Sequence, residues 1–233
     1  MKWFLTLAVA LLLVGCGAPK PAQPASQPPT EPPAQAADTT QPAAPTDTTA
    51  GMTATPPAAE KGMLKDTLVA NKLPENLYFN IKVKDYGTMK VQFYTKDAPK
   101  NVMNVANLGI KGFYNGLTFH RLIAGFMIQG GDPSGNGTGG PGYTVPAEIK
   151  KRHDKGSMAM ARTGDQVNHE RRSSGSQFYI CFKPTPQLDG QYTVIGQLTE
   201  GMDVLAGLEK VQTGAMDKPS TPVVMEKVWV TTE

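Results

Sequence analysis

Alternating apolar and polar positions dominate the chain from residue 78 onward and predict a domain rich in β-strands. Residues 78–84 and 89–94 alternate on either side of the turn formed by residues 85–87, a pattern typical of a hairpin. Two short strands follow within 119–132, where Gly125 separates them. Later strands are predicted at 157–162, 177–182, 192–198 and 223–231.

Two segments have the signals of helices instead. Residues 97–110 carry apolar side chains at helical spacing, with Asp97 expected as the N-cap and Pro99 in the first turn. Residues 201–210 predict a second helix. Many short strands with turns between them favour a closed antiparallel barrel, because closure leaves no exposed sheet edge.

The N-terminus has the form of an export signal. Lys2 precedes an apolar run that is shorter than the ~20 residues needed to span a bilayer. The run ends Leu-Val-Gly-Cys at Cys16, which resembles the lipobox of bacterial lipoproteins, in which the cysteine is acylated. We therefore expect residues 1–15 to be a lipoprotein signal peptide and Cys16 to anchor an extracytoplasmic protein to a membrane. Gly17, in place of Asp, favours the outer membrane if the host is Gram-negative. An uncleaved buried helix with a chance cysteine is the alternative.

Residues 16–62 differ sharply in composition from the rest of the chain. They are mostly Pro, Ala, Thr and Gln with almost no large apolar side chains, so they cannot bury enough surface to fold. We expect a disordered tether that holds a globular domain, residues 63–233, away from the membrane. A proline-rich segment that binds a partner is the alternative.

Composition excludes several other classes. A net charge of +3 is too small for a general electrostatic grip on nucleic acid, and two cysteines cannot make a disulfide framework. The Gly-rich loop 130–142 lacks the Gly-Lys-Ser/Thr of a phosphate-binding loop. His153 and His169 are expected in loops without metal-ligand spacing, and Cys181 is expected to be an inert core residue. No metal or cofactor is predicted.

The stretch 119–132 gathers the candidate chemistry. Its two strands would set Arg121 beside Met127 and Gln129. A guanidinium beside an apolar slot fits a proline-containing peptide, which is apolar and carries backbone carbonyls, better than a sugar, a nucleotide or a metal. His120 invites a role as a base, but alternation turns it to the opposite face from Arg121, and we expect a hydrogen-bonded structural histidine.

Several motifs in a fixed order complete this pattern. They are FHR at 119–121, GFMIQGGD at 125–132, NGTGG at 136–140, MAR at 160–162, SGSQFYI at 174–180 and LDG at 188–190. With these motifs, residues 76–233 resemble the cyclophilin family of peptidyl-prolyl cis/trans isomerases. The resemblance implies an eight-stranded antiparallel β-barrel capped by two α-helices, in agreement with the strands and helices above.

The resemblance makes Arg121 the catalytic residue, which would stabilise the twisted X-Pro amide. It implies a monomeric enzyme that needs no cofactor and assists the folding of extracytoplasmic proteins. Alternation would put Phe126 on the opposite face from Met127, so its place in the pocket depends on the resemblance. The implied substrate-binding residues are Phe126, Met127, Tyr179 and Leu188 in the proline pocket, Gln129 and Gln177 on the peptide backbone, Ala161 and Arg162 along the groove, and Tyr192 at the pocket wall.

Some positions depart from the eukaryotic family pattern. Tyr179 stands where Phe is usual, a small change if its hydroxyl reaches water, and Arg162 stands where Asn is usual. The longer loop 164–173 is either a determinant of specificity or a solvated charged loop. A non-catalytic peptide-binding or chaperone module is the rival to an active isomerase, and the presence of Arg121 favours the enzyme.

Overall fold

The computed structural model describes residues 62–69 and 72–233. The predicted signal peptide, the lipidation site Cys16 and the tether as far as residue 61 lie outside the described residues and stay predictions. Within the described part of the chain, no helix is long and apolar enough to cross a membrane.

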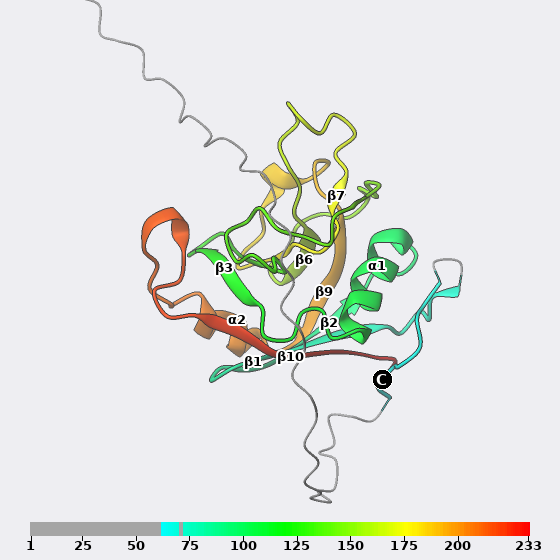
Figure 1. Cartoon of the computed structure of the whole chain (residues 1–233), viewed down its shortest axis with the longest axis horizontal. Helices are drawn as coiled ribbons and strands as arrows, with labels where there is room; N and C mark the ends of the chain where they lie inside the picture. Colours follow the sequence, from blue (N-terminus) through cyan, green and yellow to red (C-terminus); the bar gives the residue numbers. More distant parts are fainter. Residues whose placement is uncertain (1–61, 70–71) are drawn as a thin grey trace, which may run out of the picture. The chain divides into compact units, whose positions relative to one another are not determined.

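Eight antiparallel strands close into a barrel (Figure 1), which confirms the predicted fold class. The strands are β1 Tyr78–Val83, β2 Gly87–Phe93, β3 Thr118–Ile123, β4 Met127–Gly130, β6 Ser157–Met160, β8 Phe178–Cys181, β9 Val194–Glu200 and β10 Val223–Thr231. Around the barrel they follow the order β1-β10-β3-β4-β8-β6-β9-β2.

The remaining elements are two helices and several short segments. They are helices α1 Pro99–Ile110 and α2 Met202–Leu208, the 3-10 turns η3 Pro186–Leu188 and η4 Ala215–Asp217, and the paired strands β5 Thr144–Val145 and β7 Ser173–Ser174. Sequence patterns predicted both helices and all eight barrel strands, but not the two-residue strands, which are too short to show a period.

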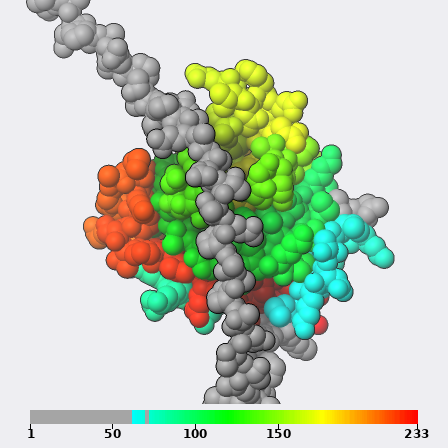
Figure 2. All heavy atoms as spheres, in the orientation of Figure 1, coloured from blue at the N-terminus to red at the C-terminus, as the bar shows by residue number. Residues whose placement is uncertain are grey.

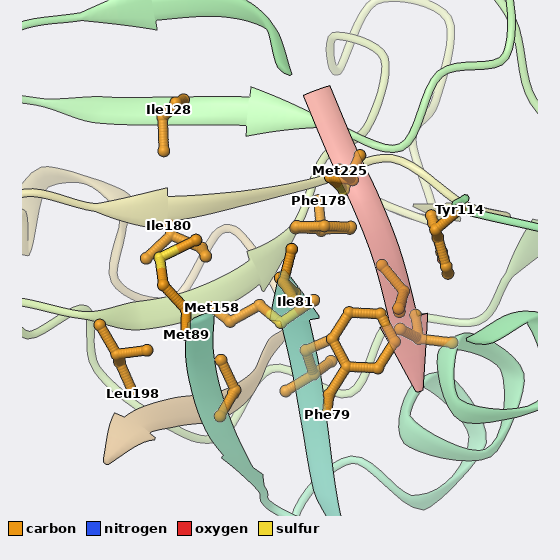
Figure 3. Close-up of a cluster of buried hydrophobic side chains, with 14 of the residues drawn as sticks. Phe79, Ile81, Met89, Tyr114, Ile128, Met158, Phe178, Ile180, Leu198 and Met225 are labelled. Carbon is orange, nitrogen blue, oxygen red and sulfur yellow. The ribbon is translucent and has the colours of Figure 1, made fainter. Parts of the chain in front are cut away.

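Buried side chains from all around the wall fill the interior of the barrel (Figure 3). Phe79 and Phe178 meet edge to face there, with ring centroids 6.0 Å apart, and Phe79 makes a similar contact with Tyr114. Val105 of α1 and Leu205 of α2 join the same core from outside the barrel wall. Because an interior filled in this way is a packed core and not a channel, a binding site must be built on the outer face.

The start of α1 is capped differently from the prediction. Asp97 is not the N-cap, because the helix begins one residue later and has no side-chain cap of its own. Glu148, distant in sequence, takes that role: its carboxylate accepts the backbone N–H groups of Lys100 at 3.1 Å and Asn101 at 2.9 Å. The Asn101 side chain also donates to Glu148, at 2.8 Å. An acceptor supplied by another segment thus satisfies the first turn.

We expect Glu148→Ala to lower the free energy of unfolding by about 1–2 kcal/mol, because two helix N–H groups lose their acceptor. Urea denaturation measures this. Asp97→Ala is the matched control: the Asp97 carboxylate pairs with Lys151 at 3.2 Å near the surface, and such pairs contribute about 0.2–1 kcal/mol. A loss from Asp97→Ala as large as that from Glu148→Ala would contradict this account of the cap.

Candidate functional site

A second cluster of buried side chains lies apart from the barrel core. Met127, Ala159 and Tyr179 belong to it, whereas their strand neighbours Ile128 and Phe178 belong to the barrel interior. Successive residues of a strand point to opposite faces, so strands β4, β6 and β8 supply the core with one set of side chains and an outer apolar surface with the other.

This outer surface is the floor of a pocket with a volume of about 150 Å³. The structure brings together every predicted substrate-binding residue there except Gln177, which lies in an adjoining groove of about 690 Å³. The groove shares three residues with the pocket and continues over the Gly-rich loop. The pocket is lined by Arg121, Phe126, Met127, Gln129, Ala161, Arg162, Tyr179, Leu188 and Tyr192.

Arg121 lies at the pocket on strand β3, directly opposite Gln129 in the ladder with β4. Its side chain is half-exposed, and its Nε donates a hydrogen bond to the carboxylate of Asp217 at 3.2 Å. Sequence reasoning missed Asp217, because it lies 96 residues further along the chain in a segment without a motif. Arg121 is thus a partly solvated cation held at the edge of an apolar surface.

Phe126 reaches the pocket because it lies in the turn before β4 and not within the strand. Gly125 adopts a left-handed backbone with φ 69°, which releases Phe126 from alternation with Met127. The Phe126 N–H donates to the Ile123 carbonyl at 3.0 Å, and the Phe126 carbonyl accepts from Phe182 N–H at 2.9 Å. The opposite-face expectation from simple alternation is therefore wrong, and both residues line the pocket.

The two glutamines contact each other. Gln129 Nε2 donates to Gln177 Oε1 at 3.0 Å, and Gln177 Nε2 donates to the carbonyls of Gly137 at 3.0 Å and Gly139 at 2.8 Å. Both amide hydrogens of Gln177 are therefore engaged by the Gly-rich loop. Gln177 thus orients Gln129 and holds the loop at the groove, and its expected contact with the peptide backbone stays a prediction.

Tyr179 belongs to a hydrogen-bonded chain behind the pocket. Its hydroxyl does not face water but lies 3.0 Å from His153 Nε2, and His153 Nδ1 lies 2.9 Å from Asp189 Oδ1. His153 lies in a loop, as expected, but it is almost fully buried and has a defined place behind the pocket that the sequence did not indicate. No sequence signal identifies this chain, because its members are 26 and 36 residues apart.

Ionisation in this chain is fixed by its surroundings. The hydrogen bond from His153 lowers the pKa of Asp189 and outweighs the opposing effect of burial. Burial raises the pKa of Tyr179 far above its usual range, so its hydroxyl stays protonated. When Nδ1–H of His153 donates to Asp189, Nε2 is left as the acceptor for the Tyr179 hydroxyl. The pocket wall is therefore positioned by three polar groups that all have partners.

Arg162 joins the loop 164–173 to the pocket. Its guanidinium lies 4.6 Å from the ring centroid of Tyr192, its Nε donates to the Gln191 carbonyl at 3.0 Å, and its Nη1 pairs with Asp165. That ion pair includes a hydrogen bond that lowers the pKa of Asp165. The start of the charged loop is thus fastened to the pocket wall, although Val167 further along is exposed.

Asp132 holds the Gly-rich loop through hydrogen bonds to its backbone. Its carboxylate accepts the backbone N–H groups of Ser134 at 2.7 Å and Asn136 at 3.0 Å, and that of Gly137 as well. Burial alone would raise the pKa of Asp132, but these backbone donors lower it overall. Residues 137–140 line the groove, so the loop backbone passes close to it as the glycines predicted.

Two other titratable groups have no part in the pocket lining. Cys181 is buried as expected, and burial raises the pKa of its thiol to about 11, so it stays a thiol at neutral pH. His120 is also buried, but neither ring nitrogen has a hydrogen-bond partner among the described residues, which contradicts the expected hydrogen-bonded histidine. A bulge in the β3–β4 pairing at this position interrupts the alternation that predicted its face. No group of three or more potential metal ligands occurs within residues 62–69 and 72–233.

His120 predicts a pH dependence of stability. Burial lowers its pKa, and the repulsion from Arg121 adds to this, although Asp132 opposes both. The unfolded chain takes up a proton near pH 6.5, whereas the folded protein does so only at lower pH. Below about pH 6.5 the unfolded state therefore binds more protons, and the free energy of unfolding falls as the pH decreases.

Urea denaturation between about pH 7.5 and about pH 5.5 tests this, and we expect a smaller fall for His120→Gln than for the wild type. His169→Gln, at an exposed histidine, is the control and should keep the wild-type dependence. Equal pH dependence in His120→Gln and the wild type would contradict the assignment.

Comparison with known proteins agrees with this architecture. Residues 78–230 match the family model described as cyclophilin type peptidyl-prolyl cis-trans isomerase. A peptidyl-prolyl cis-trans isomerase of Synechococcus elongatus is 48% identical over 129 residues, covering 55% of this chain and 84% of the relative. One from Helicobacter pylori is 43% identical over 148 residues, covering 61% and 85%.

Solved structures include similar folds. A cyclophilin type peptidyl-prolyl cis-trans isomerase of Cryptosporidium parvum aligns with a TM-score of 0.62 at 31% identity, covering 67% of this chain and 98% of that one. A second crystal structure of the same protein, also with a TM-score of 0.62, was determined in the presence of the dipeptide Ala-Pro.

Proposed function

The chain belongs to the cyclophilin type family of peptidyl-prolyl cis-trans isomerases, and from that premise we propose that it isomerises X-Pro bonds with Arg121 as the catalytic residue. The observation that carries this proposal is the position of Arg121 at a pocket with the apolar side chains Phe126, Met127 and Leu188. Such a pocket would hold a proline ring while the guanidinium contacts the adjacent amide. The C. parvum structure determined in the presence of the dipeptide Ala-Pro supports this class of ligand.

The proposed mechanism acts on amide resonance. Rotation about a peptide bond faces a barrier of about 18–20 kcal/mol, because the nitrogen lone pair is delocalised into the carbonyl. A guanidinium that binds the twisted amide more tightly than the planar one lowers this barrier, and each ~1.4 kcal/mol of preference gives roughly tenfold in rate. Arg121 offers several donors in a plane, and half of its surface is still open to a ligand.

No proton transfer is required in this scheme. The Tyr179 hydroxyl is held protonated and engaged with His153, so its part is to shape the apolar wall. Gln129, held by Gln177, would receive the peptide backbone beside the proline. The groove over the Gly-rich loop would accept residues preceding the proline. The chain's own side chains therefore bind and polarise the substrate and exchange no atoms with it.

Replacing Arg121 tests the mechanism. We expect Arg121→Ala to lower kcat/KM by about 100-fold or more, and Arg121→Lys to recover little, because lysine lacks the planar set of donors. A protease-coupled assay on an X-Pro peptide measures turnover, and urea denaturation checks that both variants fold. Arg152→Ala removes an exposed arginine outside the pocket and should leave turnover unchanged.

Wild-type turnover no faster than that of Arg121→Ala would contradict catalysis by this residue. If neither protein were faster than the uncatalysed reaction, a peptide-binding module without meaningful turnover would describe the protein better.

We also propose that the isomerase domain serves extracytoplasmic polypeptides as a monomer, anchored to a membrane through lipid on Cys16. The support is the short apolar run that ends in Leu-Val-Gly-Cys and the Pro- and Ala-rich segment 16–62 after it. Acylation with more than one chain gives stable anchoring, and a segment of about 46 residues would span on the order of 140 Å if fully extended.

Metabolic labelling with a clickable fatty acid tests the anchor. We expect the wild type to incorporate the label and to enter the detergent phase, and Cys16→Ser to lose both properties, because only the lipobox cysteine is acylated. Cys181→Ser is the matched control and should keep the label. Label retained in Cys16→Ser would contradict lipidation at this position.

A further inference from the structure

A closed loop between α2 and β10 projects from the surface of the described domain, at its left edge in Figures 1 and 2 (orange). Its base is tied by the hydrogen bond from Ser220 N–H to the Gln212 carbonyl at 2.8 Å. A second bond runs from Gly214 N–H to the Lys218 carbonyl, also at 2.8 Å. The loop 212–220 is therefore closed by its own backbone, which limits how far its tip can move.

The tip of this loop has an unusual backbone. Met216 and Asp217 are both left-handed, with φ values of 57° and 58°, a conformation that aspartate tolerates better than most residues but that costs energy for methionine. The Met216 side chain is exposed by 89% and has little packing to offset that cost. The Asp217 side chain instead lies against strand β3, where Oδ2 accepts the hydrogen bond from Arg121 Nε.

The contact with Asp217 engages only part of the Arg121 guanidinium. Within residues 62–69 and 72–233 it is the one hydrogen bond made by the Arg121 guanidinium, and it engages Nε while leaving both Nη groups without a protein partner. A long arginine side chain has several rotatable bonds, and a bond at Nε fixes the plane of the guanidinium. The two Nη groups then remain for a ligand in the adjoining pocket.

We propose that Asp217 is a positioning residue for catalysis: it orients the guanidinium of Arg121 at the proline pocket. The proposal rests on the proposed role of Arg121. The chemistry favours orientation over charge, because a carboxylate close to the guanidinium reduces its net field and could not assist by charge alone. An aligned guanidinium binds the twisted amide better than the planar one, so the effect falls on kcat more than on KM.

Two substitutions fit the left-handed backbone and separate orientation from charge. Asp217→Gly removes the carboxylate without strain, and Asp217→Asn keeps an oxygen that can accept from Nε but carries no charge. We expect Asp217→Gly to lower kcat by about threefold to tenfold with little change in KM, and Asp217→Asn to keep more than about half of the wild-type kcat.

Two matched controls isolate the contact. Met216→Gly removes an exposed side chain at the same tip and relieves its left-handed strain while keeping the carboxylate, and Glu226→Gln removes an equally exposed charge that pairs with Lys82 at 3.1 Å. Both should keep wild-type kcat. In an Arg121→Ala background, Asp217→Gly should cause no further loss, because the group that it orients is absent.

Three results would overturn the inference: wild-type or higher kcat in Asp217→Gly, an equal loss in Met216→Gly, or an undiminished loss in the Arg121→Ala background. The Arg121→Ala variant by itself tests the proposed function separately. If Arg121→Ala keeps full turnover, the proposed function fails and this inference fails with it. Loss in Arg121→Ala together with full activity in Asp217→Gly contradicts the role of Asp217 alone.

Discussion

The filled interior of the barrel is the constraint on which the site depends. Ile128 and Phe178 must point inward to pack that core, and a strand offers its alternate residues to the other face. Met127 and Tyr179 are thereby placed outside, where they form a separate apolar surface. The pocket thus needs no cavity within the fold, since the same strands that stabilise the barrel also present it.

Polar groups around this apolar surface are held by carboxylates from distant loops. Asp217 holds Arg121, and Asp165 pairs with Arg162 at the pocket wall. Asp189 fixes His153, which in turn holds the Tyr179 hydroxyl. Each of these carboxylates lies in a loop or turn, and each fixes a side chain that lines the pocket or supports its wall. The proposed binding of a twisted amide would gain from such pre-organisation, because the donors need not reorganise during the reaction.

The Gly-rich loop is also held by side chains from other parts of the chain. The Asp132 carboxylate accepts hydrogen bonds from its backbone N–H groups, and the Gln177 side-chain amide donates to two of its carbonyls. The amide oxygen of Gln177 then orients Gln129 in the pocket. One buried amide therefore links the loop that lines the groove to Gln129, the residue opposite Arg121 in the β3–β4 ladder, and a change at Gln177 would disturb both.

Sequence alone determined the strands and the helices, because the period of apolar positions is a local property, and the ordered motifs identified the pocket lining through the resemblance to the cyclophilin family. Tertiary structure alone decided what holds that lining in place. Glu148, and not Asp97, caps the start of α1, and His153 is hydrogen-bonded to Tyr179 and Asp189. Asp217 contacts Arg121, which lies 96 residues away in the sequence. An alternating pattern states which face a side chain occupies, but a hydrogen bond depends on which distant segment the closed barrel brings within about 3 Å. That information exists only once the strands have paired.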